Sequence, residues 1–287
     1  MAVGTIRSLT LNGVDATVTV TDGSAAVGKS LLITGTATAN DTKLSIARYV
    51  GTTKSLTPFG YALYCFNDLS HGGKIVTGSN GADGDVFCNG KIVLTAPGTI
   101  INGDVSAKGI ISLAADASVT GTRYQNASSI ALPSASGLNY TTAASYTSLF
   151  AATSTTGLTF GSEVNGHYQI YNYVSNLSLR GPITGSGVVY VAGDLYVTGD
   201  ITYATPDSKV SFIVQGQVIF RSDCSSAVGI YYVKDQLISE SADLNITRGI
   251  LAATKITSGV SIRVTRDNTV RDSSSEGAKL CLPGYWP

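Results

Sequence analysis

Residues 84–121 read GDVFCNGKIVLTAPGTIINGDVSAKGIISLAADASVTG, a series of short apolar segments separated by glycine turns. Successive segments begin at Val86, Ile92, Ile100, Val105, Ile110 and Val119. This spacing is too short for alternating helices and strands, and too regular for an ordinary β-sandwich. Because glycine tolerates positive φ, each segment can be a short strand closed by a tight turn. The pattern predicts a parallel β-solenoid, in which stacked coils bury one apolar column.

The same pattern returns in residues 181–265, with segments such as VVYVAGD, LYVTGD and VSFIVQGQVIF. We predict that both runs belong to one right-handed solenoid spanning residues 56–270. The apolar and aromatic stretch FGYALYCF (59–66) is expected to enter at the end of the solenoid and cap its core. Stacked coils would also expose a long polar wall that can bind or display a partner.

The composition predicts an all-β protein without a global electrostatic preference. The chain has 287 residues, of which 43% are hydrophobic and only 13% are charged, and its net charge is zero. Few helix formers and many β-branched residues and glycines favour strands and turns. A neutral protein has no overall field that would attract nucleic acid or acidic lipid, so any such binding requires a local patch.

Two segments depart from the solenoid pattern. Residues 1–55 contain longer alternating stretches separated by turns, which predict a four-stranded antiparallel sheet with one buried face. Residues 122–180 are expected to form an excursion against the flank of the solenoid, with a helix at 141–152 and a tyrosine-rich segment. The tail, residues 271–287, would be tethered to the solenoid by a cysteine.

The four cysteines contain no CxxC pair, so the sequence predicts no metal site, and no motif predicts a cofactor. We interpret them as two disulfides formed in an oxidising compartment, Cys65–Cys88 and Cys224–Cys281. The alternative is four buried thiols in a cytosolic protein.

The aspartates next to turn glycines raise the question of catalysis, because some parallel β-helices are polysaccharide-active enzymes with clustered carboxylates. Asp83, Asp85, Asp104, Asp194 and Asp200 occupy such positions. We interpret them as turn residues, because aspartate hydrogen-bonds to turn backbone and no His, Arg or Tyr recurs beside them. The stretch GSNGADGDVFCNG resembles a calcium loop in its Asp and Asn spacing but lacks the terminal Glu.

A basic segment near the end of the chain is a candidate DNA-binding strip. Its expected members are Arg248, Lys255, Arg263, Arg266 and Arg271, with Tyr231 and Tyr232 from earlier coils. Arginines could contact phosphates while the tyrosines stack on bases. The alternative is a solvated solenoid face of mixed charge.

The order of these segments resembles the large minor pilins of bacterial type IV pili, related to PilX-like and competence-associated pilins that carry a β-solenoid. The resemblance rests on FxYAL at 59–63, GDVxxNG at 84–90, GDVxAxG at 103–109 and the later GD pairs at 193–194 and 199–200. Bactofilins, which are cytosolic polymers, share the GDVxAxG element but lack the N-terminal sheet.

The resemblance implies a non-enzymatic, extracellular component at or near the pilus tip, acting in pilus assembly and in adhesion or in DNA uptake for competence. Its partners would be other pilins, and DNA or a host or abiotic surface. The leader and hydrophobic helix that anchor a pilin in the inner membrane before assembly are expected upstream of this sequence. The alternatives are a β-helix polysaccharide lyase or hydrolase and a bactofilin-like structural polymer.

Overall fold

A computed structural model describes residues 6–11, 14–23, 30–39, 42–51, 58–78, 84–131, 147–162, 168–257 and 259–266. The chain divides into two compact units, Met1–Leu56 and Thr57–Pro287. Within the described residues, no helix is long and apolar enough to cross a membrane.

The first unit is a four-stranded antiparallel sheet in which consecutive strands are neighbours. Its strands are β1 (Ile6–Leu11), β2 (Val14–Gly23), β3 (Ser30–Ala39) and β4 (Thr42–Gly51). Alternating β-branched residues favour the strands, and short connections join each strand to the next, as expected for hairpins. The antiparallel arrangement agrees with the sequence pattern.

The second unit is a parallel β-solenoid, and each complete coil contributes one segment to each of three walls. In the register of β23 with β24, residues 226–228 face 245–247, 229–233 face 249–253, and 236–238 face 255–257. These three groups lie in wall 3, wall 1 and wall 2 respectively. A single 3-10 turn, η1 (Pro58–Gly60), precedes the first strand of the solenoid. The parallel solenoid expected from the glycine spacing is therefore present, and its predicted handedness stays a prediction.

The strands distribute over the walls as follows. Wall 1 contains β15 (Thr147–Phe150), β17 (Gln169–Tyr173), β19 (Ser186–Val191), β21 (Lys209–Val214), the middle of β23 (Ser226–Ser239) and of β24 (Asp243–Thr257), β5 (Leu63–Cys65), β8 (Val86–Cys88), β11 (Val105–Ala107) and β14 (Arg123–Tyr124). Wall 2 contains the first parts of β16 (Ser154–Thr159), β18 (Leu177–Thr184) and β20 (Leu195–Tyr203), then β22 (Val218–Phe220), the ends of β23 and β24, β6 (Leu69–His71), β9 (Ile92–Leu94) and β12 (Ile111–Leu113). Wall 3 contains the last parts of β16, β18 and β20, the starts of β23 and β24, β25 (Ser261–Val264), β7 (Ile75–Thr77), β10 (Ile100–Ile101) and β13 (Ser118–Val119).

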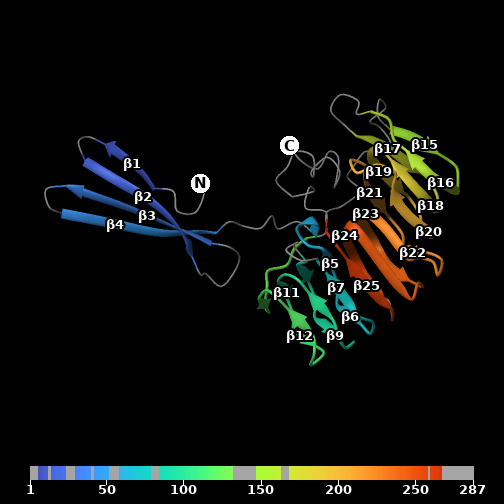
Figure 1. Ribbon diagram of the computed structural model, residues 1–287, viewed down its shortest axis with the longest axis horizontal. Helices are drawn as coiled ribbons and strands as arrows, with labels where there is room; N and C mark the ends of the chain where they lie inside the picture. The colour runs from blue at the N-terminus through green and yellow to red at the C-terminus, as the bar shows by residue number, and fades with distance from the viewer. Residues whose placement is uncertain are drawn as a thin grey trace. The chain divides into compact units, whose positions relative to one another are not determined.

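The coils do not stack in the order of the sequence. β5 pairs on one side with β24, at Leu251↔Leu63, and on the other side with β8. β15 and β16 form one end of the stack, β12, β13 and β14 form the other, and the last strands, β24 and β25, return to the middle (Figure 1). We call this junction between residues 58–78 and 243–266 the seam. The expectation that FGYALYCF caps one end is therefore wrong, because its strand has neighbours on both sides.

Backbone hydrogen bonds close the seam as they close any other pair of coils. Leu251 N donates to Ala62 O at 3.0 Å, and Phe66 N donates to Ala253 O at 2.9 Å. On wall 3, Ile262 N donates to the carbonyl of Lys74 at 2.8 Å. The two runs thus form one continuous core.

The expected helix at 141–152 is also wrong where the chain is described, because Thr147–Phe150 is strand β15. It pairs in parallel with β17, Thr147 facing Ile170 and Phe150 facing Tyr173. Pairing with a ready sheet edge outweighs a weak local helix preference. Residues 147–162 and 168–180 are likewise coils of the solenoid, where the sequence pattern had suggested an excursion on its flank.

The glycine–aspartate pairs form a ladder that joins successive coils. Asp85 Oδ1 accepts a hydrogen bond from Asp104 N at 2.6 Å, and Asp104 Oδ1 accepts one from Thr122 N at 2.9 Å. A Cβ at Gly103 would lie 2.4 Å from Asp85 Oδ1, and one at Gly121 would lie 2.4 Å from Asp104 Oδ1. Each glycine therefore leaves room for the carboxylate of the preceding coil.

The second run of coils contains the same side-chain-to-backbone hydrogen bonds. Asn176 Oδ1 accepts a hydrogen bond from Asp194 N, and Asp194 Oδ1 accepts one from Gln217 N, both at 2.8 Å. Cβ atoms at Gly193 and Gly216 would approach these oxygens to 2.0 and 2.2 Å. An asparagine serves as well as an aspartate at this position, so the ladder requires an acceptor oxygen and not a charge.

Wall 1 is apolar on both faces. Its inward residues, such as Leu63, Tyr231 and Leu251, belong to the main core. Its outward residues, such as Tyr64 and Tyr232, form a second buried cluster with Phe59 and Tyr61. The middle of wall 1 is therefore not an open binding surface, whereas Arg123 of β14 and Ser148 of β15 are exposed towards its two ends.

Candidate functional site

The turn aspartates are engaged in structural hydrogen bonds. Besides the ladder described above, Asp200 Oδ1 accepts hydrogen bonds from Ser225 N and Ser226 N, both at 2.8 Å. Asp68 Oδ1 accepts one from Lys91 N at 2.9 Å. These contacts define the structural role of the turn aspartates: their carboxylates accept hydrogen bonds from the backbone of a neighbouring coil. Asp83 lies outside the described residues.

The expected basic strip is not assembled. Arg266 is only 7% exposed and donates from Nη2 to Phe59 O at 2.9 Å and from Nη1 to Gly60 O at 3.0 Å. It holds the 3-10 turn η1 against the end of the chain's last described strand. The expectation that Arg266 belongs to an exposed DNA-binding strip is wrong, because its guanidinium is buried and bonded to two backbone carbonyls at the seam.

Tyr231 and Tyr232 are also buried, so they cannot stack on nucleic-acid bases. They are 0% and 2% exposed, and Tyr231 stacks on Phe212 with ring centroids 4.8 Å apart. The Tyr231 hydroxyl donates to Val228 O at 3.1 Å. Both tyrosines fill apolar clusters on either side of wall 1, so their part in the DNA hypothesis is wrong.

The remaining basic residues are dispersed. Arg248 lies over the ring of Tyr203 at 4.7 Å and donates to Pro206 O at 2.7 Å. Lys255 is exposed on wall 2, whereas Arg263 is exposed on wall 3. Arg271 lies outside the described residues. Among the described members of the expected strip, Arg263 is the residue that faces an open surface together with other candidate ligand-binding groups.

Arg263 lines a pocket on the outer face of wall 3, at the seam. The volume is about 240 Å³, and the lining comes from three adjacent coils. The lining residues are Lys74, Val76, Asp243, Leu244, Asn245, Ser261, Ile262 and Arg263. The floor consists of buried aliphatic residues, and the polar residues stand on the strands around it. We call this the wall-3 pocket.

The strand register places the polar groups in two rows. Asn245 faces Arg263, which faces Val76, while Asp243 faces Ser261. Lys74 directly precedes Ile75, the partner of Ile262, so it continues the row of Asp243 and Ser261. Neighbouring strands are about 4.8 Å apart and alternate residues about 7 Å, so one small ligand can reach both rows.

The charges of the wall-3 pocket are not neutralised internally. Neither Lys74 nor Arg263 forms an ion pair or a side-chain hydrogen bond with any residue that the structure describes. Asn245 Oδ1 is buried without a hydrogen-bond partner. A buried acceptor without a partner is costly, and two cations that line one pocket without a counter-ion repel each other. Both features would be relieved by a ligand with an anionic group and a donor hydroxyl.

Sequence reasoning identified Arg263 but missed Lys74, Asp243, Asn245 and Ser261. These residues are separated by up to about 190 positions, and only the non-sequential stacking brings them together. No local pattern carries that information. A signal existed only in the alternation of each strand, where outward polar residues such as Asn245 and Arg263 follow buried ones.

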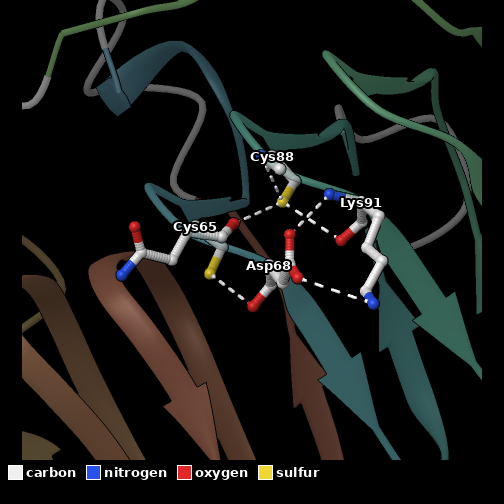
Figure 2. A network of polar contacts seen from close by, with 6 residues as sticks. Cys65, Asp68, Cys88 and Lys91 are labelled. Atoms are coloured by element: carbon white, nitrogen blue, oxygen red, sulfur yellow. Dashed lines mark hydrogen bonds and ion pairs between the residues drawn. The ribbon is translucent and has the colours of Figure 1, made fainter.

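The cysteines of the first predicted disulfide are neighbours in the structure. Cys65 of β5 and Cys88 of β8 face each other in register and are fully buried. Cys88 Sγ donates to Asn67 O at 2.6 Å, and Cys65 Sγ donates to Asp68 O at 3.5 Å (Figure 2). Both are free thiols in this structure, as is Cys224. The Cys65–Cys88 disulfide stays a prediction that the register favours, and Cys281 lies outside the described residues.

The two facing thiols are electrostatically unequal. The interaction with the facing Cys88 thiol and burial raise the pKa of Cys65, whereas the interaction with Cys65 lowers the pKa of Cys88. Gly90 N also donates to Cys88 Sγ at 3.3 Å.

His71 is a structural residue of the seam. It is 2% exposed, and its Nε2 lies 2.9 Å from Val260 O. Burial lowers the pKa of His71 from its ordinary value of 6.5. Among the described residues, no group of three His, Cys, Asp or Glu side chains could hold a metal ion. The calcium-like stretch lies partly in residues 79–83, outside the described ranges.

The sequence matches no family model and no curated protein. Among solved structures, the chain is similar to a crystal structure of an ice binding protein from an Antarctic biological consortium. The two share 15% sequence identity with a TM-score of 0.46, over 75% of this chain and 92% of that chain.

Proposed function

We propose that this chain is the exported, non-enzymatic part of a type IV minor pilin whose solenoid binds a surface ligand. The observation that carries the binding role is the wall-3 pocket, in which the cations Lys74 and Arg263 have no partner among the described residues. The pilus assignment is supported by the resemblance of the glycine-rich motifs and by an antiparallel sheet that precedes the solenoid in the chain.

Adhesion is favoured over DNA capture. Three expected members of the DNA-binding strip, Arg266, Tyr231 and Tyr232, are buried and cannot contact DNA. Without exposed aromatic residues at the pocket, bases have no stacking platform.

The pilus assignment is tested in the source cells with antibodies raised against the purified protein. If the proposal is right, immunogold labels filaments or their tips, and the protein co-purifies with pilins in the sheared surface fraction. Labelling confined to the cytosol, together with filaments formed by the purified protein in reducing buffer, would support the bactofilin-like alternative.

The enzymatic alternative is tested separately. The purified protein should leave the chain length of acidic and neutral polysaccharides unchanged during prolonged incubation, as measured by size-exclusion chromatography. Depolymerisation that is abolished by Asp85→Asn or Asp104→Asn would show that the ladder carboxylates are catalytic, and would refute a purely adhesive role.

A further inference from the structure

We propose that the wall-3 pocket binds the carboxylate of an acidic saccharide, a uronic acid unit within a polysaccharide. This proposal rests on the proposed function, since it names the ligand of the same surface. It follows from the chemistry of five side chains: two cations, one amide, one hydroxyl and one carboxylate around an aliphatic floor.

The cations define the anionic part of the ligand. Arg263 lies on the strand between those that carry Asn245 and Val76, and Lys74 lies on the strand next to its own. A guanidinium binds a carboxylate through two parallel hydrogen bonds, while an ammonium contributes a point charge from the side. Arg263 is therefore the direct partner of the carboxylate, while the Lys74 ammonium, which extends towards Gly98 of the next coil, adds attraction from the edge of the pocket.

The remaining polar groups fit hydroxyls. Asn245 Oδ1 is a buried acceptor without a partner, so it can accept a hydrogen bond from a sugar hydroxyl. The exposed carboxylate of Asp243 can only accept hydrogen bonds, whereas the Ser261 hydroxyl can donate or accept one. A ligand with a single negative charge and several neighbouring hydroxyls uses all of these groups, whereas an inorganic anion uses only the cations.

The size of the pocket fits one sugar unit and not a large molecule. Its volume of about 240 Å³ is below the range of drug-sized binding sites, which begins near ~300 Å³. The wall continues beyond the pocket along the stack, with Ser226 on one side and Ile100 and Ser118 on the other. Adjacent units of a polysaccharide can therefore lie along the wall while one unit occupies the pocket.

The test is isothermal titration calorimetry of the full chain at low salt, with trigalacturonate as the probe and maltotriose as its neutral counterpart. We expect trigalacturonate to bind and maltotriose to bind at least tenfold more weakly, because only the former supplies a carboxylate. Arg263→Ala should weaken binding about ten- to a hundredfold, the effect of losing a charge-assisted hydrogen bond. Lys74→Ala should weaken it by a smaller factor.

Two matched variants separate the pocket from general charge effects. Lys255→Ala removes an exposed cation on wall 2 and should leave the affinity unchanged. Asp243→Asn keeps an oxygen that can accept from a sugar hydroxyl and removes a negative charge one strand and two residues from Arg263, so it should tighten binding about threefold. Because Asp243→Asn predicts a gain, it remains informative even if Arg263→Ala lowers the stability of the fold.

Several results would overturn the proposal. These are no heat of binding with trigalacturonate at millimolar concentration, equal affinity for maltotriose, or equal losses in Lys255→Ala and Arg263→Ala. Arg263-dependent binding of a duplex DNA oligonucleotide that exceeds trigalacturonate binding would show that the anion is a phosphate. None of these results bears on the pilus localisation, which immunogold labelling decides independently.

Discussion

The ladder predicts a defined order of stability losses when its members are changed one at a time. In Gly103→Ala the new methyl group would lie 2.4 Å from Asp85 Oδ1 and 2.7 Å from Asp85 N. The contact with backbone nitrogen cannot be relieved by a side-chain rotation, so the coils must separate locally. Overpacking costs about 1–3 kcal/mol, and displacement of the Asp85 carboxylate adds the loss of its hydrogen bond to Asp104 N. We expect a total of about 3–5 kcal/mol.

Changes at Asp85 itself isolate the hydrogen bond. Asp85→Ala leaves Asp104 N without this acceptor and should cost about 2–3 kcal/mol, the value of a hydrogen bond to a charged group. Asp85→Asn keeps an acceptor oxygen, as Asn176 does at the equivalent position, and should cost about 1 kcal/mol. Gly72→Ala is the matched control, since a Cβ there meets nothing within 4 Å.

The assay is urea unfolding of the full chain, followed by far-UV circular dichroism. The expected order of destabilisation is Gly103→Ala, then Asp85→Ala, then Asp85→Asn, with Gly72→Ala close to the wild type. Equal stabilities of Asp85→Ala and Gly72→Ala would refute the ladder as a structural device.

Other residues give predictions of different kinds. Arg266→Ala should cost about 3 kcal/mol in urea unfolding, because two buried carbonyls lose a charged donor; no loss would contradict its role in the seam. Because the pKa of His71 is lowered by burial, the unfolded chain takes up a proton first, and stability should fall as the pH drops below 6.5. His71→Gln should flatten that fall, and an unchanged pH profile would exclude His71 as its source. Burial raises the pKa of Cys224 to about 12, so the reduced protein should lose stability as the pH rises from 9 towards 12, and Cys224→Ala should lose less. Mass analysis of air-oxidised protein should find the Cys65–Cys88 disulfide, which would add about 3.5 kcal/mol; two alkylatable thiols at these positions would show that it does not form.

The fold class was readable from the sequence because it depends on local properties. The glycine spacing within 84–121 and the alternation within 1–55 each reflect the geometry of a single turn or strand. The stacking order was not readable, because the partners of Leu63 and Ile75 lie almost 190 residues away at Leu251 and Ile262.

The errors at the candidate site concern the direction in which side chains point. Arg263 and Arg266 are three residues apart, yet the register turns one towards solvent and the other into the seam. The sequence-based DNA hypothesis assumed that neighbouring basic residues share a face. In a coil that changes direction at every corner, neighbours in sequence often point to different walls.

The seam also determines how the molecule would carry a mechanical load. The chain enters the solenoid at Pro58–Gly60 and its last described strand ends beside the same turn, where Arg266 bonds Phe59 and Gly60. A ligand held in the wall-3 pocket would pull on coils adjacent to this entry point. Tension would therefore pass through few coils, as shear across parallel hydrogen bonds, and the distant coils from Thr147 to Phe220 would stay outside the path of force.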